Sequence, residues 1–150
     1  KKRGVELDFS IAGDGELLEM CRDRIKQENL PVTILGWQSD IERVLSSADM
    51  VALTSDNEGT PLSLIQAGMV GIPVVATNVG STNEIVVNGE TGLLTDLSVV
   101  QLADAVAKVA TDSALRAKMG AAGKEYTLAR YGVSRLVKDH QDLYLRLLDR

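Results

Sequence analysis

The sequence contains few cysteine, histidine and aromatic residues: among 150 residues there are one Cys, one His, one Trp, one Phe and three Tyr. Cys21 alone excludes an internal disulfide and a multi-thiolate metal site, and a single histidine excludes most histidine-based zinc centres. With so few rings the core must be aliphatic, and 45% of the residues are hydrophobic. The lone cysteine favours a reducing, cytoplasmic environment.

Positive charge is also scarce, because 16 Lys and Arg stand against 21 Asp and Glu, for a formal net charge of -5. A nucleic-acid-binding domain normally carries a basic stripe, whereas the only basic run here is 1–3. No apolar run approaches the roughly 20 residues of a membrane helix, and no signal-peptide pattern opens the sequence. We expect no nucleic-acid partner and no transmembrane segment.

The length and the uninterrupted pattern favour one domain over residues 1–150. A chain of this size removes roughly 68–70% of its unfolded surface from water, so it needs no disulfide or metal to fold. No repeat, low-complexity tract or Pro/Gly linker divides it. The strand pattern begins almost at once, which gives the expectation that this is a fragment of a longer protein.

Apolar runs typical of strands alternate with helical patterns, and this alternation predicts an α/β fold with a parallel sheet flanked by helices. We expect strands at 7–12, 32–35, 50–54 and 73–77, with 91–94 either an edge strand or a loop. Helices are expected at 16–27, 40–47, 61–70, 81–86, 98–110, 112–122 and 134–148. The run Pro73-Val74-Val75-Ala76 is apolar on both faces, as in a central parallel strand. Ser81 and Glu84 have capping-box spacing.

Ligands of open parallel sheets bind beyond the carboxyl ends of the strands, so the loops there are the candidate sites. Four loops stand out, at 13–15, 36–38, 55–60 and 78–81. The loop Gly13-Asp14-Gly15 lacks the third glycine of a dinucleotide fingerprint because position 18 is leucine, and a plain turn explains it nearly as well. Trp37 either packs beside a nucleotide base or fills the rim of the fold.

The loop 54–61 carries the strongest local signal, because it leads from a strand into a helix. Pro61 suits the first helical position and Thr60 the N-cap. The first turn then offers the amides of Gly59, Thr60, Leu62 and Ser63 to an anion such as phosphate. Glu58 lies just outside these amides, where a neutral sugar hydroxyl can donate to its carboxylate. Gln66 lies further along the helix and can lean back toward the same pocket.

An ordered series of short segments closely resembles the nucleotide-sugar-binding half of group 1 (family 4) retaining glycosyltransferases of the GT-B fold. The series comprises Ala12-Gly13-Asp14-Gly15, Leu35-Gly36, Glu58-Gly59-Thr60-Pro61-Leu62-Ser63-Leu64-Ile65-Gln66-Ala67, Gly71-Ile72-Pro73-Val74-Val75-Ala76-Thr77, Gly80, Glu84-Ile85-Val86, Thr91-Gly92-Leu93-Leu94 and Met119-Gly120. Each segment is weak alone, but their order and spacing are specific. The resemblance implies a Rossmann-like three-layer domain, the C-terminal half of such an enzyme.

The resemblance also implies roles for particular residues. Glu58 would contact the donor sugar and act in catalysis, and the amides of Gly59, Thr60 and Leu62 would hold the sugar and diphosphate. Position 66 would reach the ribose. The residues at the other loops, Gly13, Asp14, Gly15, Trp37 and Gln38, would border the phosphates and the base. The donor would be a UDP-, GDP- or ADP-linked sugar, with no cofactor and no bound metal.

The sequence departs from this family at two places. Position 66 is Gln where the family usually has Glu, which removes an acceptor oxygen and the charge that strengthens its hydrogen bonds. The family's diphosphate-neutralising Arg and Lys belong to a preceding segment that this chain does not contain. The resemblance further implies an N-terminal acceptor domain that this chain does not include, so we expect the isolated fragment to be inactive. That missing domain is where any attachment to a membrane surface would arise.

Other functions remain open at this stage. Gln66 suggests a non-catalytic nucleotide-sugar-binding or regulatory module, and a nucleotide-sugar epimerase shares the architecture but fits the segment at Glu58 less well. Asp56 and Glu58 resemble a hydrolase pair only superficially, because glycosidase carboxylates come from separate elements. His140 shares a helical stripe with Leu136, Leu143 and Leu147. His140 is therefore interpreted as a helix-packing residue, and family members often send this helix back to the N-terminal domain. In this chain the stripe is expected either to be left exposed or to contact a neighbour such as a second copy.

Overall fold

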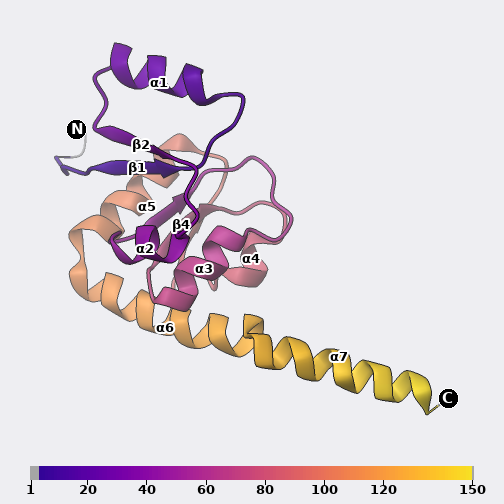
Figure 1. The fold of residues 1–150 in the computed structure, drawn as a ribbon. Coiled ribbons are helices and arrows are strands. Elements are labelled where there is room, and N and C mark those ends of the chain that lie inside the picture. Colours follow the sequence, from indigo (N-terminus) through magenta and orange to yellow (C-terminus); the bar gives the residue numbers. More distant parts are fainter. Residues whose placement is uncertain (1–3, 150) are drawn as a thin grey trace. The chain divides into compact units, whose positions relative to one another are not determined.

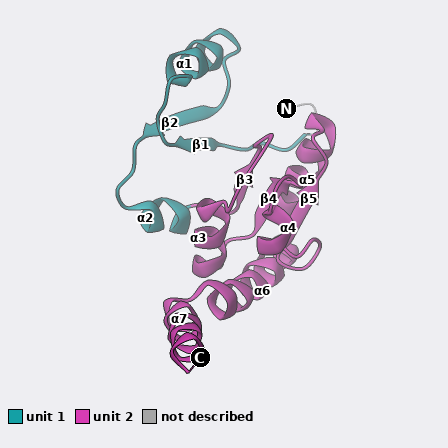
Figure 2. Ribbon diagram, turned by 90° about the vertical axis from the view of Figure 1, so that its right-hand side faces the viewer, with its two compact units in different colours: residues 1–47 teal, residues 48–150 magenta. Residues whose placement is uncertain are grey.

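The computed structural model describes residues 4–149, which form two compact units divided between Ser47 and Ala48 (Figure 2). Strands and helices alternate along the chain, and all strand pairs are parallel. This confirms the predicted α/β class with parallel strands and flanking helices. The basic run at 1–3 lies outside the described residues. The expectation of a single domain concerns the whole chain and stays a prediction.

The first unit contains β1 (Phe9–Ala12), α1 (Leu18–Gln27), β2 (Val32–Gly36) and α2 (Ile41–Ser46) (Figure 1). The two strands form a parallel pair in which Phe9 lies opposite Val32. Helix α2 begins after Asp40, whose side chain accepts a hydrogen bond from the Arg43 amide, as an N-cap should. The expected elements are therefore present, with ends shifted by one or two residues.

The second unit contains a three-stranded parallel sheet and five helices. Its strands, in the order in which they pair, are β3 (Val51–Leu53), β4 (Val74–Thr77) and β5 (Gly92–Thr95). Its helices are α3 (Leu62–Val70), α4 (Thr82–Ile85), α5 (Val99–Thr111), α6 (Ser113–Tyr131) and α7 (Val133–Leu148). The segment that the sequence left open between strand and loop is thus a strand, because its backbone pairs with the buried β4.

Strand β4 is the centre of the second unit. All four of its residues are buried, as its doubly apolar sequence predicts. Val75 packs in a cluster with Ala105 and Val109 of α5 and Met119 of α6. This aliphatic core fixes the strand whose carboxyl end leads into the loop 78–81.

Helices α3 and α6 approach closely because glycines lie between them. A Cβ on Gly68 would lie 2.4 Å from Cγ2 of Thr127, and one on Gly120 would lie 2.1 Å from the carbonyl oxygen of Gly71. The absence of side chains at these two positions lets the backbones pack together. The contact anchors α3, the helix at whose start the candidate site lies.

Helix α6 is longer than predicted, since it runs through Gly123 to Tyr131 instead of ending at residue 122. Gly123 is buried, and the Tyr126 and Tyr131 hydroxyls both donate to the Glu84 carbonyl, at 2.8 and 3.0 Å. Tertiary packing therefore outweighs the low helix propensity of glycine. The next helix, α7, has no buried residue and extends away from the sheet (Figure 1).

The strands pair as β1-β2 in the first unit and as β3-β4-β5 in the second. The alternating pattern predicts which segments are strands, but pairing depends on which edges are hydrogen-bonded. Among residues 4–149, β1 and β3 each pair on one side only. No helix in that range is long and apolar enough to cross a membrane.

Candidate functional site

The loop between β3 and α3 holds Glu58 in a defined position. The Glu58 carboxylate is partly buried, and its Oε1 accepts a hydrogen bond of 2.6 Å from the Ser55 hydroxyl. The carbonyl of Ser55 in turn accepts one of 2.6 Å from Thr77, the last residue of β4. The loop is thereby tied to the carboxyl end of the central strand, and the hydrogen bonds within residues 4–149 leave Oε2 of Glu58 without a donor.

Two residues of the next loop support the same segment. Gly80 has a φ of +53°, and a Cβ there would lie 1.7 Å from the Glu58 carbonyl oxygen, so only glycine fits against this backbone. The Ser81 hydroxyl donates to the Gly59 carbonyl. The sequence indicated the loop 78–81 as a candidate but none of its residues as part of the site. The contact between Ser81 and Gly59 joins residues 22 positions apart, and no pattern in the sequence indicates such a contact.

The amides at the start of α3 are available for an acceptor. None of the hydrogen bonds formed within the described part of the chain is donated by the amides of Gly59, Thr60, Leu62 or Ser63. The Leu64 amide is the first one engaged, and it donates to the Pro61 carbonyl at 3.1 Å. No atom lies within 4 Å of the position of a Cβ on Gly59. A ligand oxygen can therefore reach this turn of backbone.

One predicted N-cap residue is wrong, and at a second N-cap the predicted side-chain bond is not made. Helix α3 begins at Leu62 with Pro61 as its N-cap residue, so Thr60 is not the cap. The reason is that Pro61, with ψ 100°, is still extended. Ser81 does precede α4, but its side chain makes no capping bond, because the hydroxyl is used on the Gly59 carbonyl.

Gln66 lies on α3 four residues after Leu62, so the two side chains project from one face of the helix. Leu62 is 67% exposed, and Gln66 is partly exposed between buried neighbours. Among the described residues the Gln66 amide has no hydrogen-bond partner. It is free to bind a ligand that lies along the first turns of α3.

The remaining predicted residues lie in the first unit, in the loops that follow β1 and β2. The Gly13 amide donates to the Gly36 carbonyl at 2.8 Å and joins the two loops. Gly13 and Gly15 have φ of +134° and +147°, which favours glycine at both. With Asp14, Cys21 and apolar neighbours they line a hollow of about 190 Å³.

Trp37 and Gln38 behave differently within the second of these loops. Trp37 is 76% exposed, so it does not fill the rim of the unit, and its ring is open to a ligand. The Gln38 side-chain nitrogen donates to the Leu35 carbonyl at 2.8 Å, which leaves its second N–H and its oxygen available to a ligand.

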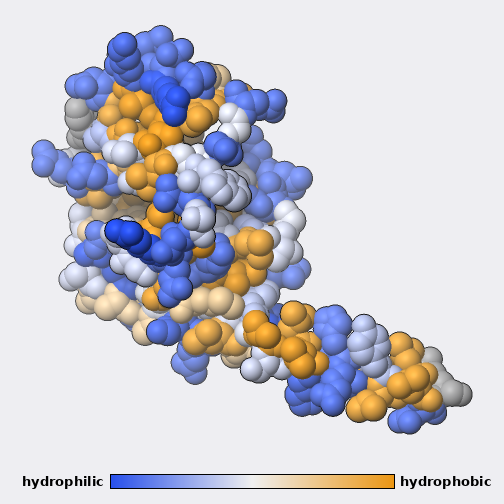
Figure 3. Space-filling model, viewed as in Figure 1, coloured by the Kyte–Doolittle hydropathy of each residue, from blue (hydrophilic) through white to orange (hydrophobic). Residues whose placement is uncertain are grey.

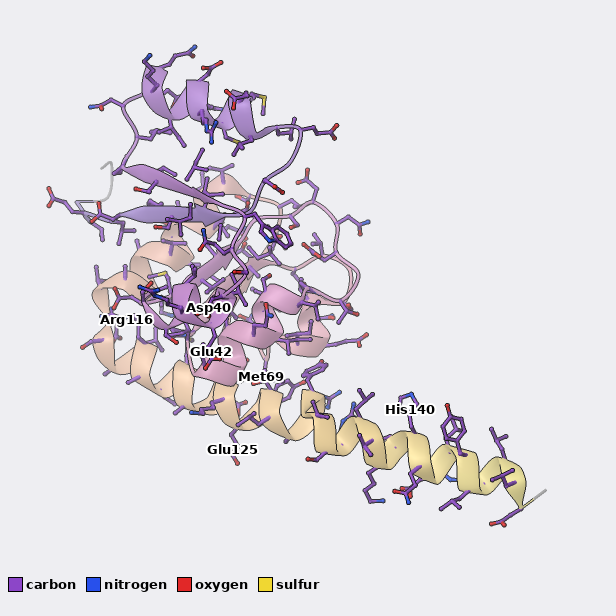
Figure 4. The ribbon with its side chains drawn as sticks, in the orientation of Figure 1. Asp40, Glu42, Met69, Arg116, Glu125 and His140 are labelled. Atoms are coloured by element: carbon purple, nitrogen blue, oxygen red, sulfur yellow. The ribbon has the colours of Figure 1, made fainter. Side chains whose placement is uncertain are left out.

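His140 does not belong to a ligand cluster. It projects from α7 (Figure 4), where its Nδ1 lies 2.8 Å from the Leu136 carbonyl and its ring 6.3 Å from that of Tyr144. Its stripe is exposed, with Leu136, Leu143 and Leu147 between 49% and 56% accessible, and apolar residues appear along the helix in Figure 3. Within residues 4–149 the stripe is thus left exposed, which is one of the two outcomes expected for it. No three His, Cys, Asp or Glu side chains in that range could hold a metal ion.

The family model described as glycosyl transferases group 1 matches residues 1–126. The chain belongs to this family. The free helix-start amides and the glutamate beside them thus occur in a group 1 glycosyltransferase, as the series of short segments predicted.

Individual relatives agree with this assignment. One relative is the Escherichia coli UDP-Gal:alpha-D-GlcNAc-diphosphoundecaprenol alpha-1,3-galactosyltransferase, with which the chain shares 28% sequence identity. The match covers 93% of this chain and 37% of that protein. It is 25% identical to Anabaena HepE in complex with UDP, with a TM-score of 0.83, over 96% of this chain and 41% of that one. For the C-terminal domain of a group 1 family protein from Francisella tularensis, the identity is 27% and the TM-score 0.70, over 79% and 64%.

This group 1 glycosyltransferase chain spans about two fifths of the length of the first two curated relatives that it matches. The matches cover 37% and 39% of those proteins. The solved structures support the GT-B glycosyltransferase fold over nearly all of it.

Proposed function

We propose that this chain is the donor-binding C-terminal part of a retaining glycosyltransferase, which binds a nucleoside diphosphate sugar and presents it to an acceptor held by an N-terminal domain. The observation that carries the proposal is the start of α3, where unpaired backbone amides lie directly beside a carboxylate held by a serine.

The amides suit the diphosphate of the donor. Four backbone N–H groups at Gly59, Thr60, Leu62 and Ser63 have no acceptor among the described residues. They lie at the positive end of the dipole of α3, where phosphate oxygens are favoured. Open space beside Gly59 lets the phosphate approach the backbone.

Glu58 suits the sugar instead of the phosphate. A carboxylate repels a phosphate, whereas it accepts hydrogen bonds from neutral hydroxyl groups. The hydrogen bond from Ser55 fixes one carboxylate oxygen and leaves the other for a sugar hydroxyl. Glu58 therefore orients the donor sugar for transfer, and it is the residue that we assign to catalysis.

The other contacts follow from the family resemblance and the exposure of the residues. Gln66 contacts the ribose, Trp37 and Gln38 border the base, and Gly13, Asp14 and Gly15 border the phosphates. During transfer, the bond from the anomeric carbon to the leaving phosphate breaks, the bond to the acceptor oxygen forms on the same face, and the acceptor proton passes to the phosphate. The isolated chain binds the donor without catalysing this step.

We propose that the basic residues that neutralise the diphosphate belong to another part of a cytoplasmic parent enzyme.

Calorimetric titration of the 150-residue chain with UDP, GDP and ADP, and with one sugar-bearing form of each, tests the proposal. We expect one base to be preferred, with weak binding. Glu58→Ala should leave affinity for the bare nucleotide nearly unchanged and weaken binding of the sugar form about 10- to 100-fold, as expected for a hydrogen bond to a charged group.

Asp56→Ala is the matched control, because Asp56 is an exposed carboxylate in the same loop. It should alter neither affinity. Three titrations without heat would refute the nucleotide site, and an equal loss for both ligand forms in Glu58→Ala would show that Glu58 does not contact the sugar.

Gln66 also motivates the alternative of a non-catalytic binding module. In the parent enzyme, donor turnover before and after Gln66→Glu separates the two. Turnover with Gln66 in place supports the transferase, whereas donor binding without turnover in both proteins supports the module.

A further inference from the structure

A second hollow opens in the larger unit, beyond the carboxyl ends of β4 and β5. Its volume is about 500 Å³, more than twice that of the hollow beside Gly13. Its lining consists of polar side chains and three aliphatic ones: Asn78, Asn83, Val86, Val87, Asn88, Leu94, Thr95, Asp96 and Gln101. Nothing in the proposed donor site uses these residues.

Thr95 provides the observation that points to a ligand. The residue is only 8% exposed, and its Oγ1 is a buried side-chain oxygen with no hydrogen-bond partner within residues 4–149. A buried hydroxyl without a partner costs about 1–3 kcal/mol, and such groups are rare in folded proteins. Thr95 is one of the lining residues, so a turn of its side chain about χ1 would bring this hydroxyl to a hydroxyl group bound in the hollow.

Hydrogen bonds within the lining use some of its polar groups and leave others unpaired. The Gln101 side chain donates to Oδ2 of Asp96 and accepts from the Asp96 backbone amide, both at 3.2 Å. Asn88 accepts from the Leu94 amide at 2.9 Å. These bonds hold the wall in place and leave the second Asp96 oxygen and the Asn88 side-chain NH₂ group without partners in the described chain.

The side-chain amides of Asn78 and Asn83 add further donors and acceptors, and both residues are exposed. The Asn78 backbone donates to the Thr95 carbonyl at 2.7 Å, which holds the two residues side by side. The hollow thus presents donors and acceptors from two neighbouring segments.

The charge of the lining selects the class of ligand. Among the residues of 4–149 that line the hollow, Asp96 is the only charged one, so within that range a phosphate or carboxylate would meet a negative group and no cation. The lining also suits a divalent cation poorly, because such an ion prefers several charged oxygen ligands and Asp96 supplies the carboxylate of a single residue. A sugar ring fits better, because its hydroxyls pair with amides, a carboxylate and a threonine, and its C–H face contacts Val86, Val87 and Leu94.

We propose that this hollow is a second carbohydrate site, which binds a neutral sugar unit through Thr95, Asp96 and the surrounding asparagines. Because β3, β4 and β5 are parallel, their carboxyl ends share one edge of the sheet, and the hollow lies on the same edge as the Glu58 loop. That this sugar is a unit of the product chain rests on the proposed function. Binding of a sugar in the hollow does not depend on it.

The test is a titration of the 150-residue chain, labelled with ¹⁵N, with glucose, galactose, mannose and N-acetylglucosamine at millimolar concentrations. We expect at least one sugar to cause saturable chemical-shift changes in the amides of Asn83, Asn88 and Asp96. The amides of the Glu58 loop serve as an internal control, since a sugar in the hollow should leave them unshifted.

Thr95→Val and Thr127→Val form a matched pair. Thr95→Val removes the unpaired hydroxyl, so it should leave the melting temperature unchanged or raise it, while weakening sugar binding about 2- to 10-fold. Thr127 is also buried, but its hydroxyl donates to the Gly123 carbonyl at 2.7 Å. Thr127→Val should lower the melting temperature and leave sugar binding unchanged.

Three results would overturn the proposal. The first is that none of the four sugars shifts the lining amides. The second is that sodium phosphate or calcium chloride shifts them and the sugars do not, which would mean an ion site. The third is that Thr95→Val binds the sugar as tightly as the unaltered chain, which would mean that the hydroxyl meets only water.

Discussion

Replacing Gly80 with alanine would disturb the backbone contact that supports Glu58. The new Cβ would lie 1.7 Å from the Glu58 carbonyl oxygen and 2.8 Å from its carbonyl carbon, far inside contact distance. The φ of +53° also belongs to the left-handed region, which costs a residue with a side chain roughly 1–2 kcal/mol. Forcing an extra methyl group into a packed site costs a further 1–3 kcal/mol, roughly. The total expected loss of unfolding free energy is about 2–5 kcal/mol.

Gly89→Ala isolates the contact from the backbone conformation. Gly89 has a φ of +81° and no atom within 4 Å of the position of a Cβ. It should therefore cost only the conformational part, roughly 1–2 kcal/mol. Urea denaturation followed by circular dichroism at the helix band measures both variants, because most helices belong to the second unit.

The difference between the two variants should be at least about 1 kcal/mol. Gly80→Ala should also weaken binding of a nucleotide sugar, since relief of the clash moves Glu58. Equal losses of stability in the two variants, together with unchanged sugar-nucleotide binding in Gly80→Ala, would refute the claim that Gly80 supports the Glu58 loop.

Two further predictions concern the helices. Gly120→Ala should destabilise the chain by roughly 1–2 kcal/mol, because the clash with the Gly71 carbonyl exceeds the gain in helix propensity; a more stable variant in urea denaturation would show that α3 and α6 pack loosely. On α7, Lys138 donates a hydrogen bond of 2.5 Å to the Asp142 carboxylate, and this bond lowers the pKa of Asp142. The pair is therefore fully formed above the ordinary pKa of aspartate, and it is lost as the pH falls through the lowered pKa. In a carboxyl NMR titration, Lys138→Gln should return that pKa toward the ordinary value, and an unchanged pKa would contradict the pairing.

The sequence predicted the strands better than the ends of the helices. The run from Pro73 to Ala76 indicated a central strand because both of its faces are apolar, and the structure buries it. The continuation of α6 through Gly123 was missed, because glycine is a poor helix former and its burial against Thr91 is a tertiary contact. Periodicity carries no information about such contacts.

The candidate site shows the same division. The sequence around Glu58, Pro61 and Gln66 predicted a helix start, which the structure contains, and its ligand-binding role stays a prediction. The support from Gly80 and Ser81 could not be predicted, because it depends on how two loops pack at the sheet edge. The unpaired hydroxyl of Thr95 is likewise invisible in the sequence, since a threonine at the end of a strand usually finds a partner.

The amide spectrum of the chain with and without UDP tests the central claim most directly. The claim predicts that the amides of Gly59, Thr60, Leu62 and Ser63 shift as UDP saturates the chain, while those of α7 do not. Saturable shifts confined to other residues, with these four amides unchanged, would contradict it.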